Sequence, residues 1–199
     1  MLSWDPAGGL TIGAWNNNTV YAVTSAGAVN TLIPSSAGIS GPAGVAYDNS
    51  GNLYIANGNN GKISKWNGST INNNFATGMN SPFKMIYYNG YLYATDAWGA
   101  SEIYSVNVST GGAVTLYLPT SVGLNVPESI GVDAFGNLIV EDYSDDGLFR
   151  VDAQKHVTVL VPGSVATMTN PNGIAIPPSQ LIYTVEEGNT TSRMFVIAP

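Results

Sequence analysis

The stretch GPAGVAYDNSGNLYIANGNNGKISKW, residues 41–66, contains three short apolar segments separated by turn residues. The segments are rich in Val, Ile and Tyr, and Gly, Asn, Asp and Ser cluster between them. Short segments of this kind, bounded by such clusters, are typical of β-strands joined by tight turns. If the stretch occurs once, it predicts only a local hairpin, whereas a repeated stretch predicts the whole fold.

The stretch is one copy of a repeat. Its first half, 45–54, aligns with 130–139 and with 2–11, and altered copies lie at 85–93 and 174–183. Residues 10–34 also align with residues 93–119, which places Trp15 over Trp98. Most of the chain is therefore built from similar units.

The repeat length indicates the architecture. Four units begin with Pro42, Pro82, Pro127 and Pro171, which are 40, 45 and 44 residues apart. A period of about 40–45 residues with several short strands per unit is typical of a propeller blade. We therefore expect a single all-β domain, a β-propeller of about five four-stranded antiparallel blades. The expected blades are residues 1–41, 42–81, 82–126, 127–170 and 171–199.

The last predicted blade is incomplete. Its residues end after a third strand at 194–197, and the first blade starts directly on its own first strand. Two interpretations follow: a small ring with a three-stranded last blade, or part of a larger, six-bladed ring completed by other polypeptide. An exposed sheet edge also invites self-association.

Composition excludes several kinds of partner. The net charge of −7 with only six Lys and Arg argues against nucleic-acid binding, which needs clustered cations. No apolar run approaches the roughly 20 residues of a membrane-spanning helix, and the N-terminus does not read as a signal peptide. The chain has no cysteine. Few lysines and many Asn, Thr, Ser and Gly favour an extracellular, periplasmic or cell-surface location.

The pattern P-x-G-V-A-x-D-x-x-G-N-L-Y-I-A-N at residues 42–57 resembles the NHL-repeat β-propellers. It is also similar to the gluconolactonase-like (senescence marker protein-like) and virginiamycin lyase-like propellers. The resemblance covers nearly the whole chain. It implies the architecture but not one activity, because this superfamily includes lactonases, lyases and binding platforms.

Propeller geometry indicates where a site would lie. The first strand of each blade lines the central channel, so the residue after each starting proline is expected at one channel mouth. The turns between second and third strands are expected at the same mouth. Three carboxylates fall in register with Asn57 at the ends of second strands and are candidate catalytic bases: Asp96, Asp142 and Glu186. Such residues more often bond the backbone of their own turn.

The resemblance also implies a metal. In the gluconolactonase-like family, Glu, Asn and Asp from different blades hold one divalent cation at this mouth. Glu128 and Asn172 look like two of these ligands, for Ca²⁺ or another divalent cation, whereas Ala43 and Phe83 offer no donor at the corresponding positions.

A second calcium pattern is partial. Asp142 and Asp146 lie in an acidic loop that ends in Gly147, but Ala153 stands where a bidentate Glu is expected.

Aromatic residues give a competing prediction. Trp15, Phe83, Trp98 and Tyr143 are expected at the mouth, where they would form a platform for a sugar ring or an apolar peptide, or pack between blades. His156, the only histidine, is expected on the opposite face, which disfavours histidine-dependent catalysis.

Three functional hypotheses follow. The first is a binding or scaffolding propeller whose partner at the mouth is a small molecule, a glycan or a protein. The second is a metal-dependent, lactonase-like hydrolase or lyase. The third is a structural subunit that completes its open blade with a partner chain. The sequence favours a protein without catalytic activity.

Overall fold

The computed structural model describes residues 2–163, 169–186 and 193–198. Short 3₁₀ helices at Trp15–Asn17, Ser35–Ala37 and Thr120–Val122 are the only helices among them, and none could span a membrane. The strands within these residues are β1 (Leu2–Trp4), β2 (Leu10–Ala14), β3 (Thr19–Val23), β4 (Val29–Ile33), β5 (Pro42–Tyr47), β6 (Leu53–Asn57), β7 (Lys62–Trp66), β8 (Ile71–Thr77), β9 (Met85–Tyr88), β10 (Tyr91–Asp96), β11 (Glu102–Asn107), β12 (Ala113–Leu118), β13 (Pro127–Val132), β14 (Leu138–Asp142), β15 (Gly147–Val151), β16 (Val157–Val161), β17 (Pro171–Ala175), β18 (Ile182–Glu186) and β19 (Met194–Ile197).

The strands form five antiparallel sheets, each from consecutive strands of one predicted unit. Four sheets have four strands, β1–β4, β5–β8, β9–β12 and β13–β16, and in the described residues the fifth has three, β17–β19. We call them the first to fifth blades. The all-β propeller of about five blades, with an incomplete last blade, is confirmed.

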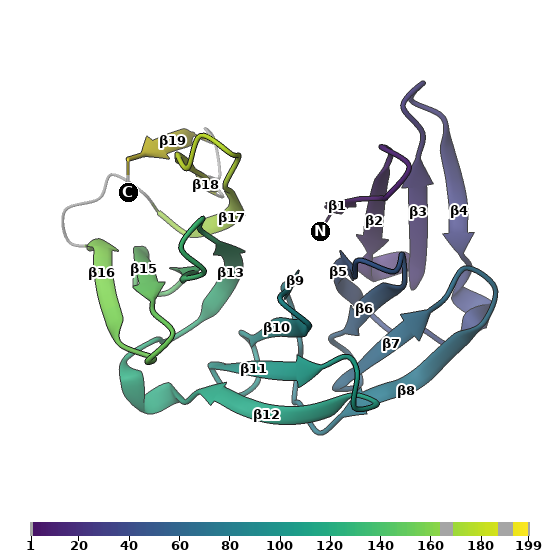
Figure 1. The fold of residues 1–199 in the computed structure, drawn as a ribbon, viewed down its shortest axis with the longest axis horizontal. Coiled ribbons are helices and arrows are strands. Elements are labelled where there is room, and N and C mark those ends of the chain that lie inside the picture. The colour runs from purple at the N-terminus through teal and green to yellow at the C-terminus, as the bar shows by residue number, and fades with distance from the viewer. Residues whose placement is uncertain (1, 164–168, 187–192, 199) are drawn as a thin grey trace.

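The blades follow one another around a centre (Figure 1). The first strand of each blade lies on the inside, where β5, β9, β13 and β17 are successive neighbours. The fourth strands β4, β8, β12 and β16 form the outside. The first and fifth blades face each other across an opening, so the described residues form an arc.

Apolar side chains alternate between the two faces of each blade, and the core lies between blades. Leu53 and Ile55 of β6 pack with Val20 and Ile33 of the first blade. Tyr54, which points to the other face, packs with residues of the third blade such as Leu92. The same alternation repeats around the arc, so each pair of neighbouring blades buries one apolar layer between its two sheets.

The apolar positions of the repeated strands predict eleven core residues, and eight of them are buried: Val45, Leu53, Ile55, Ile63, Met85, Ile103, Ile139 and Val151. The prediction was wrong for Val132, Ile174 and Phe195, which are partly exposed. Val132 and Ile174 line the cavity at the centre of the arc. Phe195 pairs with Thr184 on the face turned to the fourth blade, and it lies in the outermost described strand of the fifth blade.

Three of the five inner strands, β5, β13 and β17, carry an irregularity at their starts. The register with the second strand shifts between Pro42 and Gly44 in the second blade, and at the equivalent places in the fourth and fifth blades. The extra residues are Ala43, Glu128 and Asn172. A β-bulge redirects the side chain of its extra residue, which explains why the residue after the starting proline occupies a special position in these three blades.

The glycine after this bulge lets the next blade approach. A Cβ built on Gly44 would lie 2.4 Å from the carbonyl oxygen of Phe83 and 3.0 Å from the amide nitrogen of Met85, both in the third blade. At the equivalent Gly173 of the fifth blade, the nearest atom is Val185 Cγ2 of the same blade, at 3.0 Å.

We therefore predict that Gly44→Ala lowers the free energy of unfolding by about 1–3 kcal/mol, because the added methyl group forces two backbones apart. Gly173→Ala is the matched control and should cost clearly less. Urea denaturation of both variants measures the difference. Equal losses of unfolding free energy in the two variants would show that the approach of the next blade is not the reason for glycine at this position.

Candidate functional site at the channel mouth

The polar residues that end the second strands bind the backbone of the segment entering each blade. Asn57, Asp96, Asp142 and Glu186 are all buried. Their side-chain oxygens accept hydrogen bonds from amides that precede the starting prolines, such as the amide of Ser40 at 3.0 Å from Asn57 Oδ1. Asp96 likewise accepts the amides of Asn80 and Ser81, at 2.7 and 2.9 Å. We call this repeated contact the strand-end latch.

Asp142 makes the fullest latch. Its oxygens accept the amides of Asn125 and Val126 at 2.5 and 3.0 Å, and also those of Ser144 and Asp145 at 3.2 Å. The Oδ1 atom of the other acidic residue predicted for calcium, Asp146, accepts the amide of Asn170 at 2.6 Å. The carboxylate oxygens of Asp142 and Asp146, which a calcium loop would use as ligands, therefore accept hydrogen bonds from backbone amides in this structure.

Glu186 closes the latch of the fifth blade. It accepts the amide of Thr169 at 3.0 Å and pairs with Arg193, whose Nε lies 2.5 Å from Glu186 Oε1. The Arg193 guanidinium holds the pKa of Glu186 below its usual value. Of the two sequence interpretations for Asp96, Asp142 and Glu186, the geometry matches backbone binding.

A lysine of the third blade contacts a bulge residue of the fifth blade across the mouth. Lys84, from the segment that leads into β9, reaches past the fourth blade, and its Nζ donates to Asn172 Oδ1 in the fifth blade at 3.4 Å. The same Nζ lies 5.2 Å from the centre of the Phe83 ring, a cation–π distance. Glu128 is buried in the fourth blade, between the two strands that Lys84 connects. Phe83 and Asn172 thus lie close to one ammonium group, and Glu128 belongs to the blade between them.

A second glutamate lies behind this group. Glu141 of β14 is fully buried and accepts hydrogen bonds from the hydroxyl of Thr184 and the amide of Gly173 in the fifth blade. Its other oxygen, Oε2, has no hydrogen-bond partner among the described residues. Burial raises the pKa of Glu141 to about 7, although Thr184, Gly173 and Lys84 act in the opposite direction.

The four predicted aromatic residues form two pairs. Trp15 and Phe83 meet edge to face at 6.1 Å, and Trp98 and Tyr143 do so at 5.6 Å. A Cβ on Gly58 would lie 2.4 Å from the Trp15 ring, so Trp15 covers the neighbouring turn. Trp98 is 57% exposed. Trp15 therefore packs between blades, whereas Trp98 presents its ring to solvent.

Groups suited to metal binding or acid–base catalysis are sparse. No three His, Cys, Asp or Glu side chains gather to hold a metal ion in the described parts of the chain. His156 lies in the turn between β15 and β16, at the opposite end of the blade from the mouth, and its Nδ1 is 3.0 Å from Asp152 Oδ2.

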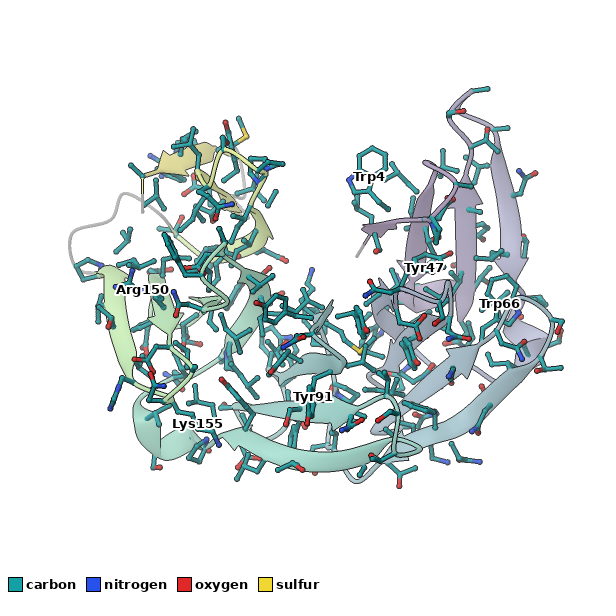
Figure 2. The ribbon with its side chains drawn as sticks, viewed as in Figure 1. Trp4, Tyr47, Trp66, Tyr91, Arg150 and Lys155 are labelled. Carbon is teal, nitrogen blue, oxygen red and sulfur yellow. The ribbon has the colours of Figure 1, made fainter. Side chains whose placement is uncertain are left out.

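The inner side of the arc also forms an open cavity of about 700 Å³. It is lined by the later residues of the inner strands, including Tyr47, Tyr87 and Val132, and by Trp4 of the first blade. Figure 2 shows Trp4 reaching from β1 into the opening of the arc. The bulges lie at the starts of these strands, so this cavity lies toward the opposite face from the mouth.

Lys84, Glu141 and this cavity are not among the sites predicted from the sequence. Lys84 carried a signal, because it is one of only six Lys and Arg and stands where other repeats have Gly44, Ser129 and Gly173. Glu141 likewise replaces Ala56 and Thr95 of the preceding blades. The cavity had no local signal, since it depends on how far the blades are splayed around the centre.

Comparisons with known proteins agree with the fold. The family model for the NHL repeat matches residues 40–66. No curated protein matches the sequence. Among solved structures, a putative gluconolactonase is 13% identical with a TM-score of 0.76, over 100% of this chain and 73% of that chain.

Two further solved structures are similar. A catalytically inactive His-to-Ala variant of virginiamycin B lyase from Staphylococcus aureus, crystallised with quinupristin, is 15% identical with a TM-score of 0.76, over 100% of this chain and 65% of that chain. A chain of a nidogen/laminin complex is 17% identical with a TM-score of 0.81, over 98% and 74%. The resemblance to NHL-type and gluconolactonase-like β-propellers is therefore confirmed at the level of the fold.

The strand-end latch predicts that removal of its acceptor side chain destabilises the fold. Asp142 is buried, and Asp142→Ala leaves the amides of Asn125 and Val126 without their acceptor, so it should lower the free energy of unfolding by about 2–4 kcal/mol. Asp145→Ala, an exposed neighbour, is the control and should change it by less than about 0.5 kcal/mol. Urea denaturation decides, and an unchanged midpoint for Asp142→Ala would refute a structural role.

Glu141 predicts a pH dependence. Between its ordinary pKa of 4.5 and about 7, the folded protein holds a proton at Glu141 that the unfolded chain has released. Stability should fall as pH rises through this window, by up to about 3 kcal/mol, and level off above it. Glu141→Gln should remove this contribution, so its stability relative to the native protein should rise between pH 5 and pH 8. Urea denaturation at both pH values measures this change. The same difference in urea midpoint between Glu141→Gln and the native protein at pH 5 and at pH 8 would contradict the raised pKa of Glu141.

Proposed function

We propose that the protein is a binding module whose ligand is held at the channel mouth, around Lys84. The observation that carries the proposal is the contact from Lys84 to Asn172 across the mouth, because it brings together side chains from the third and fifth blades. Convergent polar groups from separate elements are the usual sign of a binding site. The strand-end carboxylates, by contrast, are engaged with backbone amides.

The groups at the mouth suit a ligand that carries hydroxyl groups on an apolar ring. Lys84 supplies ammonium donors, Asn172 supplies both a donor and an acceptor, and Glu128 supplies acceptors. The exposed ring of Trp98, supported edge to face by Tyr143, offers a stacking surface at the same end of the propeller. We therefore propose a glycan as the ligand class.

Two further observations support a binding role. The NHL repeat is an architecture without one fixed chemistry, and one of the similar folds belongs to a complex of two proteins.

The low content of lysine and the abundance of Asn, Thr, Ser and Gly support an extracellular, periplasmic or cell-surface location for this binding module.

A metal-dependent lactonase-like enzyme is the second candidate. Glu128 and Asn172 support it, because they lie at equivalent bulge positions of adjacent blades, as the resemblance implies for metal ligands. The residues present do not fit a divalent cation, because the Lys84 ammonium contacts Asn172 Oδ1 and would repel it. We therefore derive no reaction step through a metal.

The contact of Lys84 with Asn172 predicts that divalent cations do not stabilise the protein. Calcium, manganese or zinc, added to the chelator-treated protein, should leave the melting temperature unchanged within about 1 °C. A site filled at 100 times its dissociation constant would add about 2.7 kcal/mol and raise the melting temperature by several degrees. Such a shift, abolished by Glu128→Gln, would overturn the proposal in favour of the enzyme.

Binding itself is tested on a glycan array, followed by titration with the best-bound glycan. Trp98→Ala and Lys84→Met should each weaken binding roughly tenfold, which corresponds to the loss of about 1.4 kcal/mol from one stacking or charged contact. Phe135→Ala and Lys155→Met change an aromatic residue and a lysine in turns at the opposite end, and both variants should bind normally. Failure to bind any glycan, or equal losses in all four variants, would contradict a glycan site at the mouth.

A further inference from the structure

We propose that the side chains of Lys84 and Asn172 react with each other to form an isopeptide bond, a covalent amide that links the third blade to the fifth, with Glu141 as the proton-transfer group. The bond forms within the chain itself and requires no ligand at the mouth. The structure shows the two side chains before the reaction, joined by a hydrogen bond.

The reacting groups lie within reach of each other. Lys84 Nζ is 3.4 Å from Asn172 Oδ1. The carbonyl carbon of Asn172 is one bond of about 1.2 Å from that oxygen. Groups held about 3–3.5 Å apart in a fixed orientation react far faster than groups that must meet by diffusion. The two residues are 88 positions apart in the sequence, so it is the fold that brings this amine to this amide.

Hydrogen bonds hold the backbone of both residues. The amide of Lys84 donates to the hydroxyl of Thr95 at 3.1 Å, and its carbonyl accepts the amide of Thr95 at 2.9 Å. Asn172 is the extra residue of the bulge at the start of β17, and the amide of the next residue, Gly173, donates to Glu141. The two side chains therefore extend from fixed ends, which lowers the entropic cost of their reaction.

A buried acid lies beside the pair. Lysine attacks an amide only as the neutral amine, so another group must take its proton. Glu141 is completely buried, and its Oε2 atom has no hydrogen-bond partner among the described residues. The charges of Lys84 and Glu128 both act on Glu141. Burial raises the pKa of Glu141 to about 7, which suits a group that accepts and returns a proton at neutral pH.

The atoms and charges of the reaction balance. Ionised Glu141 accepts a proton from the Lys84 ammonium, and the lone pair of the free amine forms a bond to Cγ of Asn172. The proton passes from Glu141 to the amide nitrogen of Asn172, and the bond between this nitrogen and Cγ breaks, which releases ammonia. Glu141 then accepts the excess proton of the new amide nitrogen. The reaction needs no oxidant and no co-reactant.

The product takes the structural place of a disulfide. The chain has no cysteine, so no disulfide can join its blades. A covalent link between Lys84 and Asn172 removes conformational freedom from the unfolded chain, because it closes a long loop. It also holds the third and fifth blades in place on both sides of the fourth.

A second contact between a lysine and an asparagine provides an internal control. Lys62 Nζ is 2.8 Å from Asn74 Oδ1, which is closer than Lys84 is to Asn172, but this contact is exposed to solvent. A lysine surrounded by water keeps its charge at neutral pH and is a poor nucleophile. We therefore expect no bond between Lys62 and Asn74. Comparison of the two pairs separates the effect of the buried site from that of proximity.

The mass of the intact protein tests for the bond, measured after purification and again after incubation at neutral pH. The bond lowers the mass by about 17 Da, the mass of the released ammonia. Fragment spectra of a protease digest must then join the peptide that contains Lys84 to the peptide that contains Asn172. This second step is needed because cyclisation of an Asn-Gly sequence, such as residues 172–173, also releases ammonia.

Variants identify the reacting groups. Lys84→Arg keeps the positive charge but loses the nucleophile, so it should give no linked peptide, and Asn172→Ala should give none either. Asn172→Asp should form the same bond with loss of water, about 18 Da instead of about 17 Da. Glu141→Gln should lower the fraction of linked protein after the same time at least about tenfold. Lys62→Arg is the matched control and should link as the native protein does.

The absence of a linked peptide from native protein that is folded, with a single melting transition, and has been incubated would overturn the proposal. So would a linked peptide that persists in Lys84→Arg or Asn172→Ala, or one that joins Lys62 to Asn74 to the same extent. An unchanged fraction of linked protein in Glu141→Gln would contradict its role in proton transfer. None of these measurements uses a ligand, so their outcome is independent of the glycan titrations.

Discussion

The strand-end latch is the contact on which the structure of the mouth depends. In the second to fifth blades a proline stands at or shortly before the start of the inner strand, and the amides just before it must find acceptors away from the sheet. Asn57, Asp96, Asp142 and Glu186 provide these acceptors from the end of the neighbouring strand. The latch fixes where each inner strand starts, and therefore where its bulge aims a side chain. The positions of Glu128 and Asn172 follow from it.

The strand-end latch shows which polar residues at the mouth have a structural role. An acidic residue repeated at one place in several blades suggests a ring of ligands or bases when only the sequence is read. In the structure, the repeated residues satisfy the backbone, and the unrepeated ones lie at the centre: Lys84 and Glu141 each occur in one blade only. For a repeat protein, departure from the repeat is thus the better guide to a site, because a structural role is needed in every blade and a ligand only once.

Much of the fold could be predicted because its information is local and repeated. The turn clusters, the spacing of Pro42, Pro82, Pro127 and Pro171, and the short apolar segments determine strands, blades and their order. The mouth could be located from the same reasoning, and the bulges explain why the residues after the prolines are special there. The contact of Lys84 with Asn172 could not be predicted, because it joins residues 88 positions apart across the channel and depends on the splay of three blades. The partial exposure of Val132 and Ile174 could not be predicted for the same reason. The predictions of a metal at Glu128 and Asn172 and of ligand contacts at Trp98 and Tyr143 stay predictions.

Hydrogen exchange of the latched amides tests the central claim most directly. The amides of Ser40, Asn80, Ser81, Asn125 and Val126 lie outside the strands, yet each has a buried side-chain acceptor. The account predicts that they exchange as slowly as amides of the central strands β6 and β14. Exchange at the rate of exposed turn amides, such as that of Ser69, would show that the latches do not hold the inner strands in place.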